Sequence, residues 1–149
     1  MKPLLLHCPD LNYPPHTEEI RAAHKSSPGD IESSDLDSDS WDSKPFFDYL
    51  RKHGYRSRDC QRYGSLSLTY VNGSCRWHDD PGFGLVACWL IYSENPCDND
   101  AQLVTRHGPV DIREGRLCIF DANQGHAWLS NGVCVMVMAT IAPVRRCKP

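Results

Sequence analysis

Apolar and polar residues alternate in short runs from residue 63 to the end of the chain. Alternation with a period of two places successive side chains on opposite faces of an extended segment, so each run predicts a β-strand. Turn-forming residues separate the runs, and the Asn-Gly pairs at 72–73 and 131–132 are the strongest hairpin signals. The predicted strands span residues 65–70, 74–79, 84–92, 101–106, 109–112, 116–121, 125–129 and 133–144. Eight short strands with no helix between them favour a mostly β fold, an antiparallel jelly roll or barrel.

Residues 44–53 show the spacing of a helix instead. Phe46 and Leu50 lie four positions apart and give this segment an apolar face. Pro45 suits the first turn of a helix, and Gly54 suits its C-terminal end. We expect one short N-terminal helix that packs on the sheet.

The first third of the chain differs in composition from the rest. Residues 1–45 hold nine Asp or Glu and four Lys or Arg, whereas the remaining residues hold ten and twelve. The same region contains several prolines and a Ser/Asp run, with too few apolar side chains to offset the chain entropy lost on folding. We therefore expect an acidic, largely disordered tail at residues 1–43 and a folded domain at residues 44–149. The tail is a candidate surface for a protein partner, and a solvated linker is the alternative.

Charge, hydropathy and cysteine spacing disfavour several classes of function. The folded part is near neutral, which argues against non-specific nucleic-acid binding. The apolar run at 4–6 is too short for a secretory signal, and the run at 85–92 is too short to span a bilayer. The eight cysteines are spread singly with no Cys-x-x-Cys pair, which favours free thiols in a reducing compartment. We expect a cytoplasmic protein that does not bind membranes.

The candidate chemistry lies in two of the predicted strands. His78 and Asp80 are two residues apart, so an extended backbone places both side chains on one face. Asp79 then faces the other way, although a turn beginning at Asp79 would reverse this choice. His126 lies in a later strand, which a rolled sheet can return beside the first. Two imidazoles and one carboxylate suit Fe(II) and leave coordination positions open for substrates. A surface turn with an unrelated histidine is the alternative.

The wider sequence around these residues resembles the 2-oxoglutarate/Fe(II)-dependent dioxygenases, particularly their prolyl-4-hydroxylase-like branch. Residues 68–80 combine Tyr70, Gly73 and the His-x-Asp motif in the order typical of that family. Its later strands are matched in order by residues 86–92, 101–104 and 114–120, and its distal histidine by the histidine at 126. The resemblance covers residues 64–142. It implies a double-stranded β-helix that holds Fe(II) through His78, Asp80 and His126, with 2-oxoglutarate as cosubstrate.

One position departs from the family pattern. The family places a basic residue two positions after the Gly that follows the distal histidine, where it holds the far carboxylate of 2-oxoglutarate. Cys134 stands at this position. A dianionic cosubstrate needs a cationic or hydrogen-bonding partner, for which Tyr70, Arg76 and Arg106 are candidates. Arg76 shares the predicted strand face of His78, Arg106 ends a predicted strand, and Tyr70 offers a hydroxyl.

The resemblance implies an Fe(II)- and 2-oxoglutarate-dependent dioxygenase that hydroxylates a small molecule or a peptide. Trp89 and Trp128 are candidate walls of the substrate pocket, with core packing as the alternative. Two other functions fit the same residues. One is a cupin-like metalloenzyme that uses the same three ligands without 2-oxoglutarate, and the other is a non-catalytic jelly-roll binding protein.

Overall fold

A computed structural model of the chain describes residues 1–7, 10–58, 66–95 and 101–145. The elements, in chain order, are β1 (Leu4–Leu6), α1 (Thr17–Lys25), β2 (Ile31–Asp35), α2 (Lys44–Lys52), β3 (Tyr55–Ser57), β4 (Leu66–Asn72), β5 (Cys75–His78), β6 (Leu85–Ser93), β7 (Ala101–Thr105), β8 (Gly108–Ile112), β9 (Leu117–Asp121), β10 (His126–Leu129) and β11 (Val133–Pro143). The eight predicted strands and the predicted helix are all present, with ends shifted by one or two residues. The predicted strand start at Ser65 lies outside the described residues.

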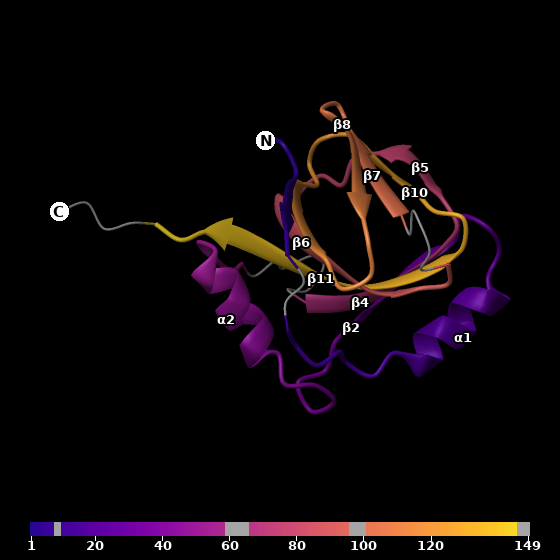
Figure 1. The fold of residues 1–149 in the computed structure, drawn as a ribbon, viewed down its shortest axis with the longest axis horizontal. Helices are drawn as coiled ribbons and strands as arrows, with labels where there is room; N and C mark the ends of the chain where they lie inside the picture. Colours follow the sequence, from indigo (N-terminus) through magenta and orange to yellow (C-terminus); the bar gives the residue numbers. More distant parts are fainter. Residues whose placement is uncertain (8–9, 59–65, 96–100, 146–149) are drawn as a thin grey trace.

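The strands form two sheets that face each other (Figure 1). A seven-stranded sheet has the order β1-β9-β6-β11-β4-β2, with β3 also paired to β11, and a four-stranded sheet has the order β5-β10-β7-β8. All pairings between the described strands are antiparallel. Neighbours in each sheet are often distant in sequence, as in a jelly roll. The predicted mostly β jelly-roll fold is confirmed.

The two faces of the larger sheet have different partners. In β11, Val133, Val135 and Val137 point to the outer face, which the helices and the N-terminal segment cover. Cys134 and Met136 point to the inner face, which looks toward the smaller sheet. Successive residues of one strand therefore belong to two separate cores, because strand side chains alternate with a period of two.

The N-terminal residues are part of this arrangement, so their predicted disorder is not confirmed. β1 pairs with β9 at one edge of the larger sheet, and β2 pairs with β4 at the other edge. Between them, Tyr13 and Trp41 pack on Trp89. The centroid of the Trp89 ring lies 5.1 Å from that of Tyr13 and 6.4 Å from that of Trp41. The N-terminal segment packs on apolar surface that the sheet supplies, and burial of that surface offsets the chain entropy lost by the segment. The composition of the segment alone therefore does not predict whether it is ordered. The division of the chain at residue 43 stays a prediction.

Both helices within the described ranges are nine residues long, and neither has the length or apolar character needed to cross a membrane. Of the eight cysteines, those at 75, 88, 118 and 134 are described, and all four are in the reduced thiol form. The other cysteines, Cys8, Cys60, Cys97 and Cys147, lie outside the described residues.

Candidate metal centre

His78, Asp80 and His126 converge at one end of the smaller sheet. His78 ends β5 and His126 begins β10, and the two are direct partners in the antiparallel register. Their ring centroids are 4.4 Å apart. The Asp80 Oδ2 atom lies 3.2 Å from His126 Nε2 and 3.5 Å from His78 Nε2. Three candidate ligand atoms, one from each residue, all lie within 4.8 Å of one another, close enough to hold one metal ion.

Backbone carbonyls set the tautomer of both histidines. His78 Nδ1 lies 2.7 Å from the carbonyl oxygen of Arg76, and His126 Nδ1 lies 2.8 Å from that of Gln124. A carbonyl oxygen only accepts, so each Nδ1 must carry the proton. The Nε2 atom of each ring then faces the shared Asp80 carboxylate oxygen and is the ring atom available to a metal. Metal-binding histidines typically donate the N–H of the other ring nitrogen to a carbonyl or carboxylate in this way, which fixes the orientation of the ring. The donor set therefore fits a transition metal.

A turn rather than strand periodicity orients Asp80. β5 ends at His78, and the Asp80 backbone N–H donates to the Ala122 carbonyl at 2.9 Å. This bond ties the segment after β5 to the connection between β9 and β10, which also delivers His126. Asp79 is exposed and stands outside the group. The structure thus places Asp80 beside the two histidines, although their role as ligands stays a prediction.

Two residues that the sequence analysis missed hold the loop after Asp80. The Asn123 Oδ1 atom accepts hydrogen bonds from the backbone N–H groups of Gly82 and Gly84, at 3.0 and 3.1 Å. The Arg58 guanidinium donates to the carbonyl oxygen of Phe83 in the same loop. Gly84 has a φ of +62° and faces this guanidinium, which a Cβ would meet at 3.1 Å. Only long-range contacts reveal these roles, because Asn123 and Arg58 are distant from Asp80 in sequence.

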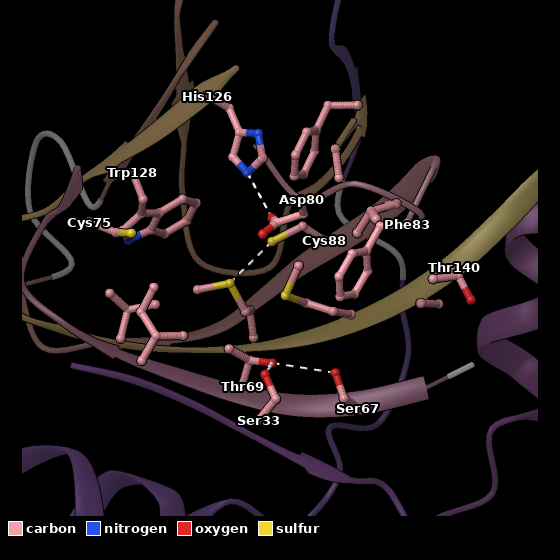
Figure 2. A pocket seen from close by; sticks show the side chains of 18 of the residues that line it. Ser33, Ser67, Thr69, Cys75, Asp80, Phe83, Cys88, His126, Trp128 and Thr140 are labelled. Carbon is pink, nitrogen blue, oxygen red and sulfur yellow. Dashed lines mark hydrogen bonds and ion pairs between the residues drawn. The ribbon is translucent and has the colours of Figure 1, made fainter. Parts of the chain in front are cut away.

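A cavity of about 390 Å³ extends from this site between the two sheets (Figure 2). Apolar and sulfur-containing side chains form most of its wall. They include Phe83, Val86, Cys88, Leu103, Phe120, Trp128, Met136 and Met138. Asp80 and the exposed residue Asp35 also line it, whereas no Lys or Arg does so within the described ranges. Burial raises the pKa of the Cys88 thiol, so this sulfur is neutral and behaves as part of the apolar wall.

Of the two predicted pocket tryptophans, one lines this cavity. Trp128 is buried in its wall, and its Nε1 donor has no hydrogen-bond partner among the residues described. Trp89 is fully buried on the outer face of the larger sheet. Its ring stacks on Phe46 with centroids 5.7 Å apart, and its Nε1 donates to the Gly115 carbonyl at 2.9 Å. Trp89 is therefore a core residue, the alternative that the sequence left open.

The three candidate partners of 2-oxoglutarate lie away from the cavity. The Tyr70 side chain points to the outer face, where its hydroxyl donates to Glu32 Oε2 at 2.7 Å. Arg106 is exposed in the turn between β7 and β8, beside His107. Arg76 is exposed on β5. None of the three lines the cavity.

An irregularity in β5 explains the position of Arg76. The register between β5 and β10 pairs His78 with His126 and Cys75 with Trp128, so three steps along β5 oppose two steps along β10. Such a β-bulge breaks the period of two. Cys75, rather than Arg76, consequently shares the cavity side with His78. Burial first, and then the Asp80 charge, raises the pKa of the Cys75 thiol.

No family model matches the chain, and no curated protein matches it. Some solved structures resemble it at 14 to 16% identity. A protein from Neisseria meningitidis has a TM-score of 0.45 at 15% identity, covering 85% of this chain and 93% of its own. A cupin superfamily protein from Desulfitobacterium hafniense has a TM-score of 0.45 at 14% identity, covering 81% and 84%. A cupin-2 domain-containing protein from Shewanella frigidimarina has a TM-score of 0.42 at 16% identity, covering 66% and 91%. Likenesses at this level assign no family to the chain.

Proposed function

We propose that this protein is an Fe(II)-dependent oxygenase that binds its metal through His78, Asp80 and His126. One observation carries the proposal. Both histidines commit Nδ1 to a backbone carbonyl, and both Nε2 atoms lie within 3.5 Å of the same Asp80 carboxylate oxygen. Two imidazoles and one carboxylate occupy one side of a metal and leave positions open for dioxygen and substrate, as in mononuclear non-haem Fe(II) oxygenases. Bound Fe(II) would supply the activation of dioxygen.

The surroundings of the site favour oxidation over hydrolysis. A zinc site with two histidines and a carboxylate activates water for hydrolysis, and such chemistry needs water and polar substrate groups nearby. Here Phe83, Phe120 and Trp128 line the adjoining cavity. These side chains offer apolar contacts to substrate carbon beside the metal position. The residues of the chain therefore contribute ligand orientation and an apolar wall.

A second candidate is the same metal chemistry with 2-oxoglutarate as cosubstrate. The order of the Tyr, His-x-Asp and distal His motifs in the sequence favours it. The cavity supports it less, because Tyr70, Arg76 and Arg106 lie elsewhere and the described cavity wall offers no Lys or Arg. Dioxygen consumption by the iron-loaded protein separates the two candidates. Consumption that requires 2-oxoglutarate and releases succinate would establish the second candidate, and consumption without it the first.

The metal site is tested by anaerobic Fe(II) titration of the full chain. We expect one Fe(II) per chain, and an affinity lower by roughly 100-fold or more in His126→Ala and in Asp80→Asn. Because Asn and Asp have nearly the same shape, Asp80→Asn removes the carboxylate charge without leaving a void that could change the packing. The matched control is His107→Ala, which removes an exposed histidine outside the site and leaves Fe(II) affinity unchanged. Equal affinity in wild type and Asp80→Asn would refute the assignment.

A further inference from the structure

A second polar group lines the cavity across from the candidate metal site. The hydroxyl oxygen of Thr69 lies 2.7 Å from that of Ser33 and 3.4 Å from that of Ser67. Figure 2 shows these three hydroxyls at the opposite side of the cavity from Asp80 and His126. The antiparallel register of β2 and β4 sets Ser33 directly opposite Thr69. We call these three residues the hydroxyl cluster.

The hydroxyl cluster retains hydrogen-bonding capacity. Its three side chains have three hydroxyl hydrogens, and only two contacts join them. No other hydrogen bond of these hydroxyls occurs within the described chain, so at least one donor is unused. Thr69 is only 3% exposed, whereas Ser67 is half-buried and Ser33 is exposed. The unused donor is available to a polar group bound in the cavity, with water as its other partner.

The stretch of cavity between the two polar ends is apolar. Figure 2 shows Phe83 and the neutral Cys88 thiol between these ends, and Val71, Val86, Met136 and Met138 also line the cavity. The whole cavity, about 390 Å³, has roughly the volume of a dozen water molecules at about 30 Å³ each. This volume admits a molecule of about that many heavy atoms, and the hydroxyl cluster and the candidate metal ligands both line the same cavity.

The charges around the cavity select against an anion. Asp35 lines the cavity close in sequence to Ser33, and Asp80 lines it at the metal end. No cationic Lys or Arg side chain within the described ranges lines the cavity. A carboxylate or phosphate placed at the hydroxyl cluster would meet no Lys or Arg of the described cavity wall and would lie near the like charge of Asp35. An uncharged hydrogen-bonding group meets neither penalty.

We propose that the cavity binds an elongated, uncharged apolar molecule that ends in a hydroxyl or carbonyl group. This end accepts a hydrogen bond from the hydroxyl cluster, and the apolar body extends toward His78, Asp80 and His126. As a substrate assignment, the proposal rests on the proposed oxygenase function. As a statement about ligand binding, it stands on the cavity alone.

The experiment compares ligands of one length on the metal-free full chain. Isothermal titration with 1-octanol, octanoate and octylamine separates a neutral end from an anionic and a cationic one. We expect 1-octanol to bind about tenfold more tightly than octanoate, because the carboxylate finds no compensating cation. Octanoate binding as tight as 1-octanol would overturn the proposal, as would octylamine binding tighter than 1-octanol. Failure of 1-octanol to bind would also overturn it.

Variants test the position of the polar end. Thr69→Val removes one hydroxyl with little change of shape and should weaken 1-octanol binding about three- to tenfold. Thr140→Val is the matched control in the same cavity, because the Thr140 hydroxyl already donates to the Arg58 carbonyl at 2.6 Å. Equal losses in the two variants would overturn the role of the hydroxyl cluster. Thermal denaturation of each variant establishes that it is folded.

The outcome for ligand class is separable from that for the proposed function. A chain that binds 1-octanol as expected but no Fe(II) refutes the oxygenase and supports the ligand class. A chain that binds Fe(II) with normal dependence on Asp80 but shows no preference for 1-octanol refutes the ligand class and supports the metal site.

Discussion

The two faces of the seven-stranded sheet are built from alternate residues of the same strands, yet they differ in filling. On the outer face, Trp89 stacks on Phe46 of α2, and Tyr13 and Trp41 pack on the same Trp89 ring. On the inner face, Cys88, Met136 and Met138 line a cavity that reaches the candidate metal site. The outer face is packed for stability, whereas the inner face keeps space for a ligand. The difference predicts that substitutions on the two faces will affect different properties.

The largest effect on stability is expected for Trp89→Ala on the outer face. Removal of this fully buried ring leaves a large void and should lower the free energy of unfolding by about 3–5 kcal/mol. Fe(II) affinity should be unchanged at temperatures where the variant is folded, because Trp89 does not line the cavity. Urea denaturation measures the first quantity and anaerobic titration the second.

Trp77→Ala is the control for this prediction. The Trp77 side chain is 54% exposed, so its loss should lower stability by less than about 1 kcal/mol. Equal destabilisation by the two substitutions would contradict the tight packing of the outer face.

A pH effect on stability is expected from the inner face. Burial raises the pKa of the Cys118 thiol from its ordinary value of 9.0 to about 12, and burial also raises the pKa of Cys88. The unfolded thiols ionise above pH 9 while the folded thiols stay neutral. Their contribution to stability is therefore complete below pH 9 and is lost as pH rises toward 12. We expect a loss of up to about 1.4 kcal/mol per pH unit for each thiol.

Urea denaturation at a series of pH values above 9 measures this dependence, and Cys118→Ala separates it from other ionisations. The free energy of unfolding of this variant should fall less steeply with pH than that of wild type. The difference in slope should be up to about 1.4 kcal/mol per pH unit, which corresponds to one proton. An unchanged slope would mean that the folded Cys118 thiol is not shielded from ionisation.

The smallest effect is expected for Met136→Leu on the inner face. The two side chains have similar volume, and Met136 lines a cavity that can absorb a change of shape, so stability should change by less than about 1.5 kcal/mol. Its neighbour Val137 is fully buried on the outer face, where Val137→Leu should overpack the core and cost about 1–3 kcal/mol. Differential scanning calorimetry compares them. Equal tolerance at 136 and 137 would argue that the two faces are filled alike.

Two residues that the sequence offers as site candidates lie away from the cavity for the same reason. Alternation along β4 and β6 shows which residues share a face, but not which face looks toward the cavity. Tyr70, a candidate for its hydroxyl, and Trp89, a candidate pocket wall or core residue, both lie on the outer face. Their neighbours Thr69 and Cys88 line the cavity instead. The choice between the faces depends on where the second sheet packs, and that is a non-local property.

Local patterns by themselves determined the strand positions, the helix at Lys44–Lys52, and the candidate set His78, Asp80 and His126. These features follow from side-chain periodicity and from the donor chemistry of the residues. Only the tertiary structure decided how the N-terminal segment docks, and that the bulge in β5 turns Arg76 outward. It also decided how the backbone bond from Asp80 to Ala122 brings the carboxylate to the histidines. Each of these depends on contacts between residues distant in the chain, which no local period encodes.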